Sequence, residues 1–158
     1  NIENLNFKIN LKYKKKFYEE RVKFREENLK KWLKLNPFYK EIVSVFKKNK
    51  KNNFFILSNK DLESIKILLK YNKINVPLKN IYHNKLFLTK NNILNKFSKD
   101  NKVYFFDDQI ENLIKIKNDN LKKFLILNRE KKYKNISEII KKNQIFLINH
   151  KKIAQFIR

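Results

Sequence analysis

Short, continuous apolar runs alternate with amphipathic stretches along most of this 158-residue chain. The runs at 53–57, 103–106 and 123–127 are typical of strands that are buried on both faces of a parallel sheet. In the stretches between such runs, apolar residues recur every three or four positions, which indicates helices. The alternation predicts an α/β domain with a Rossmann-like, doubly wound, mostly parallel sheet and helices on both faces.

Weaker patterns predict the remaining elements. From Leu5 to Leu11 every second residue is apolar, so residues 2–11 are expected to form a half-buried strand. Two shorter strands are expected at 79–83 and 145–148. Helices are expected at 15–35, 38–48, 60–72, 90–97, 109–117, 136–142 and 150–158. We expect one domain over 1–158, with residues 129–158 as a basic extension packed on or beside it.

The net charge is +24, which dominates the expected surface. A surface of this kind repels itself unless something anionic covers it, and nucleic acid is the usual partner, through release of condensed counterions. An anionic membrane surface is the lesser alternative. The sequence contains no run of about 18 apolar residues, so no insertion into a membrane is expected. The abundance of lysine, asparagine and isoleucine also fits A/T-rich codons, which raise the lysine content without selection for binding.

The basic residues form several separate runs, which favours contact with folded RNA on more than one side. The sequence carries no DNA-reading motif and no aromatic pattern of an RNA-recognition sheet, so contacts are expected mainly to phosphates, without DNA specificity. The residues expected to contact RNA are Lys14, Lys15, Lys16, Lys47, Lys48, Lys50, Lys51, Arg129, Lys131, Lys132, Lys134, Lys151 and Lys152.

The chain contains no glycine and no cysteine. Without glycine it can form neither a Gly-rich phosphate loop nor a GxSxG nucleophile elbow. Without cysteine, disulfide bonds and Cys-based metal sites are excluded. His83 and His150 have no partner at ligand spacing, so no metal ion is expected at either residue.

Polar residues follow the expected strands where ligands bind in doubly wound sheets. An apolar strand ends in Ser58, Lys90 stands before a later strand, and that later strand ends in Asp107 and Asp108. In order and spacing these residues resemble the second, third and fourth motifs of the haloacid dehalogenase-like superfamily of phosphatases and phosphotransferases. The resemblance covers most of residues 4–128 and implies the fold of that superfamily.

The first motif of that family is an apolar strand followed by Asp-x-Asp, and its first Asp attacks phosphorus. The corresponding positions are expected to hold Lys8, Asn10 and Lys12. The resemblance implies Mg²⁺ between the first Asp and the fourth-motif acids, but a charged lysine has no lone pair to bind a metal. We therefore expect no catalysis and no cofactor, with the Lys8 ammonium in place of the metal beside Asp107 and Asp108.

Each of these residues also has a plainer interpretation. Asp107 and Asp108 could cap the helix expected to begin near Gln109. Ser58 could be a turn residue, and Lys90 could be one more solvated lysine. Trp32 lies on an apolar helical stripe and is expected in the core.

Three functions remain open. We expect first a non-catalytic, RNA-contacting structural subunit of a large ribonucleoprotein, foremost an organellar ribosome, with ribosomal RNA and neighbouring ribosomal proteins as partners. A mitochondrial or other organellar matrix would then be its location, with the cytoplasm as the alternative. The second function is an active Mg²⁺-dependent phosphatase or nucleotidase whose nucleophile motif lies upstream of residue 1. The third is a free regulatory pseudoenzyme that binds a nucleotide or protein.

Overall fold

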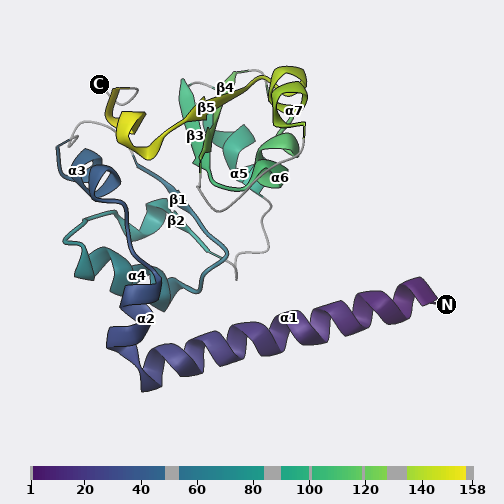
Figure 1. Ribbon diagram of the computed structural model, residues 1–158, viewed down its shortest axis with the longest axis vertical. Coiled ribbons are helices and arrows are strands. Elements are labelled where there is room, and N and C mark those ends of the chain that lie inside the picture. The colour runs from purple at the N-terminus through teal and green to yellow at the C-terminus, as the bar shows by residue number, and fades with distance from the viewer. Residues whose placement is uncertain are drawn as a thin grey trace.

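The computed structural model describes residues 2–48, 54–83, 90–99, 101–118, 120–127 and 135–155. Within these residues the protein is α/β, with helices packed around short parallel strands (Figure 1). None of the described helices is both long enough and apolar enough to span a bilayer.

The chain begins with a long helix, α1 (Ile2–Glu27), which extends away from the rest of the molecule towards the N-terminus (Figure 1). The expected strand over 2–11 is therefore wrong. Ile2, Leu5 and Ile9 are spaced by three and four residues, so the same stretch also fits a helix. Neither glycine nor proline separates it from the charged residues that follow, and each added helical residue gains a backbone hydrogen bond.

The helix expected over 15–35 is divided at Asn28. Asn28 has a φ of −141°, which is not helical. Its carbonyl accepts a hydrogen bond from the Trp32 N–H, which is the first hydrogen bond of α2 (Leu29–Leu35). Trp32 is buried at 3% exposure, as its apolar stripe predicts. Further along, α3 spans Lys40–Lys48 and α4 spans Leu62–Tyr71.

The first sheet has two parallel strands, β1 (Ile56–Leu57) and β2 (Ile81–Tyr82). The 3₁₀ turn η1 (Leu78–Asn80) leads into β2. The core beneath this sheet joins α4 to both strands and consists of Ile65, Leu69, Ile74, Val76 and Ile81, with Phe38, Val43, Phe46, Ile56 and Leu62 around them.

The second sheet has three parallel strands in the order β3 (Val103–Asp107), β4 (Leu121–Ile126) and β5 (Ile145–Ile148). In register, Val103 lies opposite Leu121, and Lys123 lies opposite Ile145. The flanking helices are α5 (Lys90–Phe97), α6 (Ile110–Ile114) and α7 (Ile136–Lys142). The chain then forms the 3₁₀ helix η3 (His150–Gln155).

Side chains pack against both faces of this second sheet, although Phe146 and Leu147 of β5 are exposed. On one face, Phe105 and Leu125 pack with residues of α5, α6 and α7. On the other face, Phe124 packs with Val45 of α3 and Ile153 of η3. Because successive strand residues point to opposite faces, each continuous apolar run fills two cores.

The strands expected at 53–57, 79–83, 103–106, 123–127 and 145–148 are confirmed as short parallel strands. They form two sheets among the described residues, where a single sheet was expected. Side chains nevertheless join the two sheets. Leu57 packs against the core around Phe105, whereas Phe54 packs against the core around Phe124 on the opposite face.

Candidate functional site

The carboxyl end of β3 meets the beginning of α5 at an ion pair. Lys90 Nζ lies 2.7 Å from Asp107 Oδ2, and Asp107 is buried at 9% exposure. The apolar strand β3 carries Asp107 to the edge of the sheet, while the core residues Ile93 and Leu94 hold α5 in place. The structure thus brings together the residues that resemble the third and fourth motifs.

The Asp107 carboxylate accepts hydrogen bonds from two further groups. The backbone N–H of Gln109 donates to Oδ1 at 2.8 Å, and Asn112 Nδ2 donates to Oδ1 and Oδ2 at 3.1 and 3.0 Å. Asp107 therefore holds the turn that leads into α6 without being its N-cap residue, which is Gln109. Asp108 is exposed.

Ser58 directly follows β1. Its backbone N–H donates to Tyr82 O at 2.9 Å, which continues the pairing of β1 with β2. Its Oγ accepts a hydrogen bond from the Lys60 backbone N–H at 3.1 Å, so Ser58 forms the turn between β1 and α4. This contact leaves the hydroxyl proton of Ser58 available for a ligand.

Lys8, Asn10 and Lys12 do not follow a strand, because all three belong to α1. The alignment that placed them at the first motif is therefore wrong. It rested on an alternating apolar pattern that is typical of a strand, whereas the segment forms a helix. Their side chains lie outside the described part of the structure.

The described residues at the Lys90–Asp107 edge do not form an Mg²⁺ site on their own. The described residues contain no group of three His, Cys, Asp or Glu side chains that could hold a metal ion. The Lys90 ammonium and Asn112 also occupy the oxygens of Asp107. A metal at this edge would need additional carboxylates from elsewhere.

A second polar cluster, which was not expected from the sequence, joins α1 to α4. Arg25 is buried at 6% exposure and donates from Nη1 to Asp61 Oδ1 and to Ser64 Oγ, both at 2.6 Å. Burial alone would raise the pKa of Asp61, but hydrogen bonds from Ser64 and Arg25 outweigh it and lower the pKa to about 2. The available signal was Asp61 just before an apolar helical run, at a position where Asp favours an N-cap.

Beside this cluster, α1, α2 and the start of α4 line a cavity of about 640 Å³. Lys60 points into it and donates to Asn36 Oδ1 at 2.7 Å, with its Nζ 5.8 Å from the centre of the Trp32 ring. Burial and, secondarily, the nearby charge of Arg21 lower the pKa of Lys60 to about 8.

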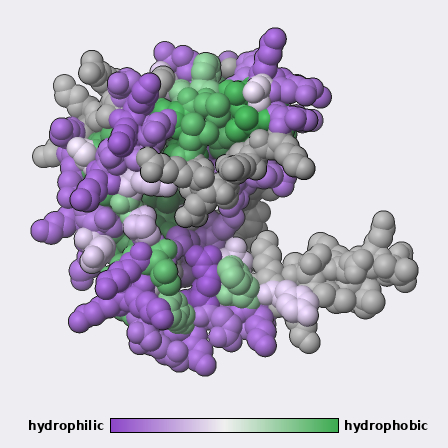
Figure 2. Space-filling model, in the orientation of Figure 1, coloured by the Kyte–Doolittle hydropathy of each residue, from purple (hydrophilic) through white to green (hydrophobic). Residues whose placement is uncertain are grey.

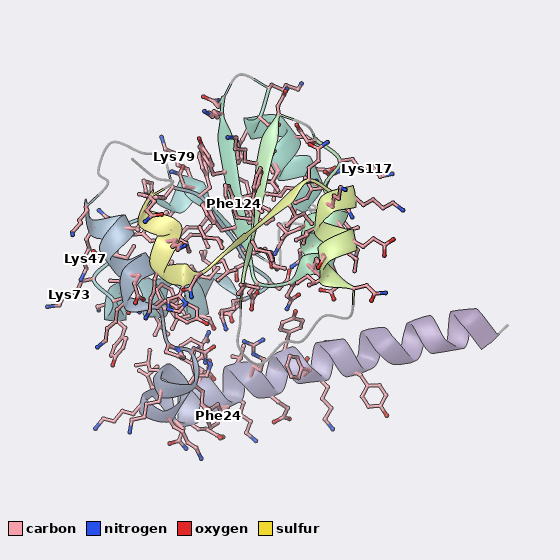
Figure 3. The ribbon with its side chains drawn as sticks, turned by 45° about the horizontal axis from the view of Figure 1, so that its top comes forward. Phe24, Lys47, Lys73, Lys79, Lys117 and Phe124 are labelled. Atoms are coloured by element: carbon pink, nitrogen blue, oxygen red, sulfur yellow. The ribbon has the colours of Figure 1, made fainter. Side chains whose placement is uncertain are left out.

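Most basic residues that the structure describes are exposed. Figure 3 shows Lys47 and Lys73 on one side of the molecule and Lys117 on the other. Among the residues expected to contact RNA, Lys14 belongs to α1, and Lys15, Lys16, Lys47, Lys48, Lys151 and Lys152 are exposed. Lys50, Lys51, Arg129, Lys131, Lys132 and Lys134 lie outside the described residues.

Comparisons with protein-family models, with curated proteins and with solved structures found no match.

Proposed function

We propose that the protein is a phosphate-handling enzyme of the haloacid dehalogenase type, whose nucleophile lies on a strand upstream of residue 1. The Lys90–Asp107 ion pair at the carboxyl end of β3 carries this proposal. The expectation of a lost nucleophile depended on Lys8 following a strand. Since that segment is helical, the active alternative now has the better support.

The arrangement of the two sheets also supports an additional strand. β1 forms its ladder with β2, and β3 forms its ladder with β4. Because Leu57 and Phe54 pack into the cores on opposite faces of the β3–β5 sheet, the edge of β1 lies beside that sheet. One parallel strand between β1 and β3 would complete a single doubly wound sheet and place its carboxyl end between Ser58 and Asp107.

At this edge the described residues would bind and orient a phosphoryl group. The Lys90 ammonium has three N–H donors and uses one on Asp107, while the Ser58 hydroxyl keeps its proton for donation. Donors fixed in this way stabilise the negative charge that develops during phosphoryl transfer. Asp107 positions Lys90.

The test is hydrolysis of p-nitrophenyl phosphate by the protein produced with every residue that its reading frame encodes. We expect Lys90→Ala to lower kcat/KM by roughly 100-fold, in the range found when one charge-stabilising donor is removed. The exposed Lys96→Ala on the same helix is the matched control and should retain the parent rate. Absence of hydrolysis by the parent protein, or equal rates in Lys90→Ala and Lys96→Ala, would contradict the proposal.

The charge supports a second candidate function, which is contact with RNA in a large ribonucleoprotein such as an organellar ribosome. Exposed lysines lie on several sides of the molecule and the net charge is +24 (Figure 3). Contacts of this kind go to phosphates and weaken as salt rises. Co-sedimentation with ribosomal RNA at low salt that is lost at high salt is the expected result, and failure to co-sediment at low salt would reject this candidate.

A further inference from the structure

The cavity between α1, α2 and α4 has the dimensions of a ligand site. Its volume of about 640 Å³ falls within the roughly 300–1,000 Å³ of small-molecule pockets. Tyr18, Val22 and Trp32 supply an apolar part of the lining. The three helices meet at one end of α1, on the side of the molecule away from the N-terminus (Figure 1).

Every carboxylate that lines this cavity is engaged by a cation other than Arg21 or Lys60. Glu19 pairs with Lys15 and Glu63 pairs with Lys66, at 3.8 and 3.7 Å. Arg25 engages the remaining two, Glu26 at 3.6 Å and Asp61 at 2.6 Å.

Among the described residues neither Arg21 nor Lys60 forms an ion pair of its own at this cavity, although the nearby Asp61 carboxylate, which pairs with Arg25, partly offsets the lowering of the Lys60 pKa. The guanidinium carbon of Arg21 lies 5.4 Å from the centre of the Phe17 ring, and Lys60 donates a hydrogen bond to the neutral Asn36 side chain. Burial and the charge of Arg21 lower the pKa of Lys60, which indicates that the two cations repel each other in a partly desolvated space. An anion between them would replace this repulsion by attraction.

We propose that this cavity binds a small organic anion, with its phosphate or carboxylate between Arg21 and Lys60 and its apolar part against Tyr18 and Val22. The planar guanidinium of Arg21 suits either anionic group, since both accept paired hydrogen bonds. The proposal does not rest on the phosphate-handling function, because Lys60 contacts the residues of that site only through its backbone N–H, which donates to Ser58 Oγ, and its side chain points elsewhere to Asn36.

Trp32 makes a direct test possible, because it is the only tryptophan of the chain and it lines the cavity. Phenyl phosphate and benzoate are titrated separately while Trp32 fluorescence is recorded with excitation at long wavelength. We expect at least one of them to give a saturable change. Inorganic phosphate should bind at least about tenfold more weakly than phenyl phosphate, because it cannot bury a ring. Absence of saturation with both organic anions, or tighter binding of inorganic phosphate, overturns the proposal.

Variants then assign the binding to the two cations. Arg21→Gln and Lys60→Gln should each weaken binding of the organic anion by about tenfold, because each removes a charged hydrogen bond. The exposed Lys70→Ala on α4 also removes one positive charge and should bind like the parent protein. Unchanged affinity in both glutamine variants, or an equal loss in Lys70→Ala, rejects the site.

A loss of binding in Lys60→Gln can be separated from unfolding. Removing a partly buried cation that Arg21 repels should leave the melting temperature equal to or higher than that of the parent protein. Thermal unfolding followed by circular dichroism provides the check. A purely structural Lys60 would instead lower the melting temperature and leave the affinity of the folded fraction unchanged, and that result would also overturn the proposal.

Discussion

Lys90 Nζ and Asp107 Oδ2 lie 2.7 Å apart, and this ion pair ties the first residue of α5 to the last residue of β3. The carboxylate is buried and also accepts hydrogen bonds from Gln109 and Asn112. One side chain thus holds a helix start, a strand end and a lysine in a fixed arrangement, which is the geometry on which the proposed phosphate site depends.

Replacing Asp107 by Ala should destabilise the fold. The change leaves the partly buried Lys90 without its anion and leaves the Gln109 N–H and Asn112 without their acceptor, so we expect the free energy of unfolding to fall by about 1–3 kcal/mol, the cost of leaving such groups without a partner. Urea denaturation monitored by circular dichroism measures the loss. Asp108→Ala, at the exposed neighbouring position, should cost much less, and an equal cost in the two variants would contradict this account.

The coupling between Lys90 and Asp107 can be isolated with a double-mutant cycle. Lys90→Ala, Asp107→Ala and the double variant should be non-additive, with an interaction free energy of about 1–3 kcal/mol, because the two side chains are in direct contact. The cycle of Lys96 with Asp107 is the reference and should be additive. Additivity in the first cycle would show that the ion pair contributes nothing to stability.

The Arg25–Asp61 contact should be what anchors α1 to α4. Asp61→Ala removes the partner of a buried arginine and the acceptor of the Ser64 N–H, and should cost about 3–5 kcal/mol at pH 7. The exposed Glu63→Ala on the same helix is the control and should change stability little. If Asp61→Ala unfolds at the same urea concentration as the control, the anchor is not required.

The same carboxyl group should contribute to acid denaturation. The pKa of Asp61 in the folded protein is about 2, below its ordinary value of 3.8. Its stabilising effect is therefore complete above about pH 3.8 and is lost as the pH falls towards 2. The difference in melting temperature between the parent protein and Asp61→Asn should shrink over this interval, and a constant difference would be inconsistent with the ion pair.

Lys60 should make stability rise with pH as well, but in the alkaline range. The pKa of Lys60 is about 8 in the folded protein, against an ordinary value of 10.5. Between these values the unfolded chain binds a proton that the folded protein does not, so this residue makes stability increase with pH. The melting temperature of the parent protein relative to Lys60→Met should rise from pH 8 to pH 10.5. A flat or falling difference would show that Lys60 is not desolvated.

Phe124 should be the most sensitive position of the β3–β5 sheet. It is 1% exposed, and its ring stacks on Phe106 at 4.8 Å and on Phe146 at 5.4 Å. Phe124→Ala should cost about 3–5 kcal/mol through lost burial and a residual cavity. Phe146 is 53% exposed, so Phe146→Ala should cost far less. Figure 2 shows a hydrophobic area in the part of the molecule where Figure 1 places the β3–β5 sheet. Equal losses of unfolding free energy in the two variants would show that Phe124 is not the most sensitive position of this sheet.

The strands were predictable because their signal is local. A continuous apolar run such as Val103–Phe106 can be buried only from both sides, and a parallel sheet between helices provides that environment. The proximity of Lys90 and Asp107 came from a resemblance in order and spacing, and the structure places them in contact. Asp61 was not singled out from the sequence, and its pairing with Arg25, 36 residues earlier, has no local signal.

The segment 2–11 shows where local patterns fail. Its apolar residues fit both the alternation of a strand and the spacing of a helix. Only the contacts that the segment makes with the rest of the protein decide between these two structures.

The sequence by itself determined the α/β class, the positions of the five strands that the structure describes and the strongly basic composition, because these depend on local periodicity and on charge. Only the tertiary structure decided that the N-terminal segment is a helix and that the strands divide into two sheets. It alone also placed Arg21 and Lys60 at one cavity. These features depend on contacts between residues far apart in the chain, and the free energies of such contacts cannot be inferred from any local stretch of sequence.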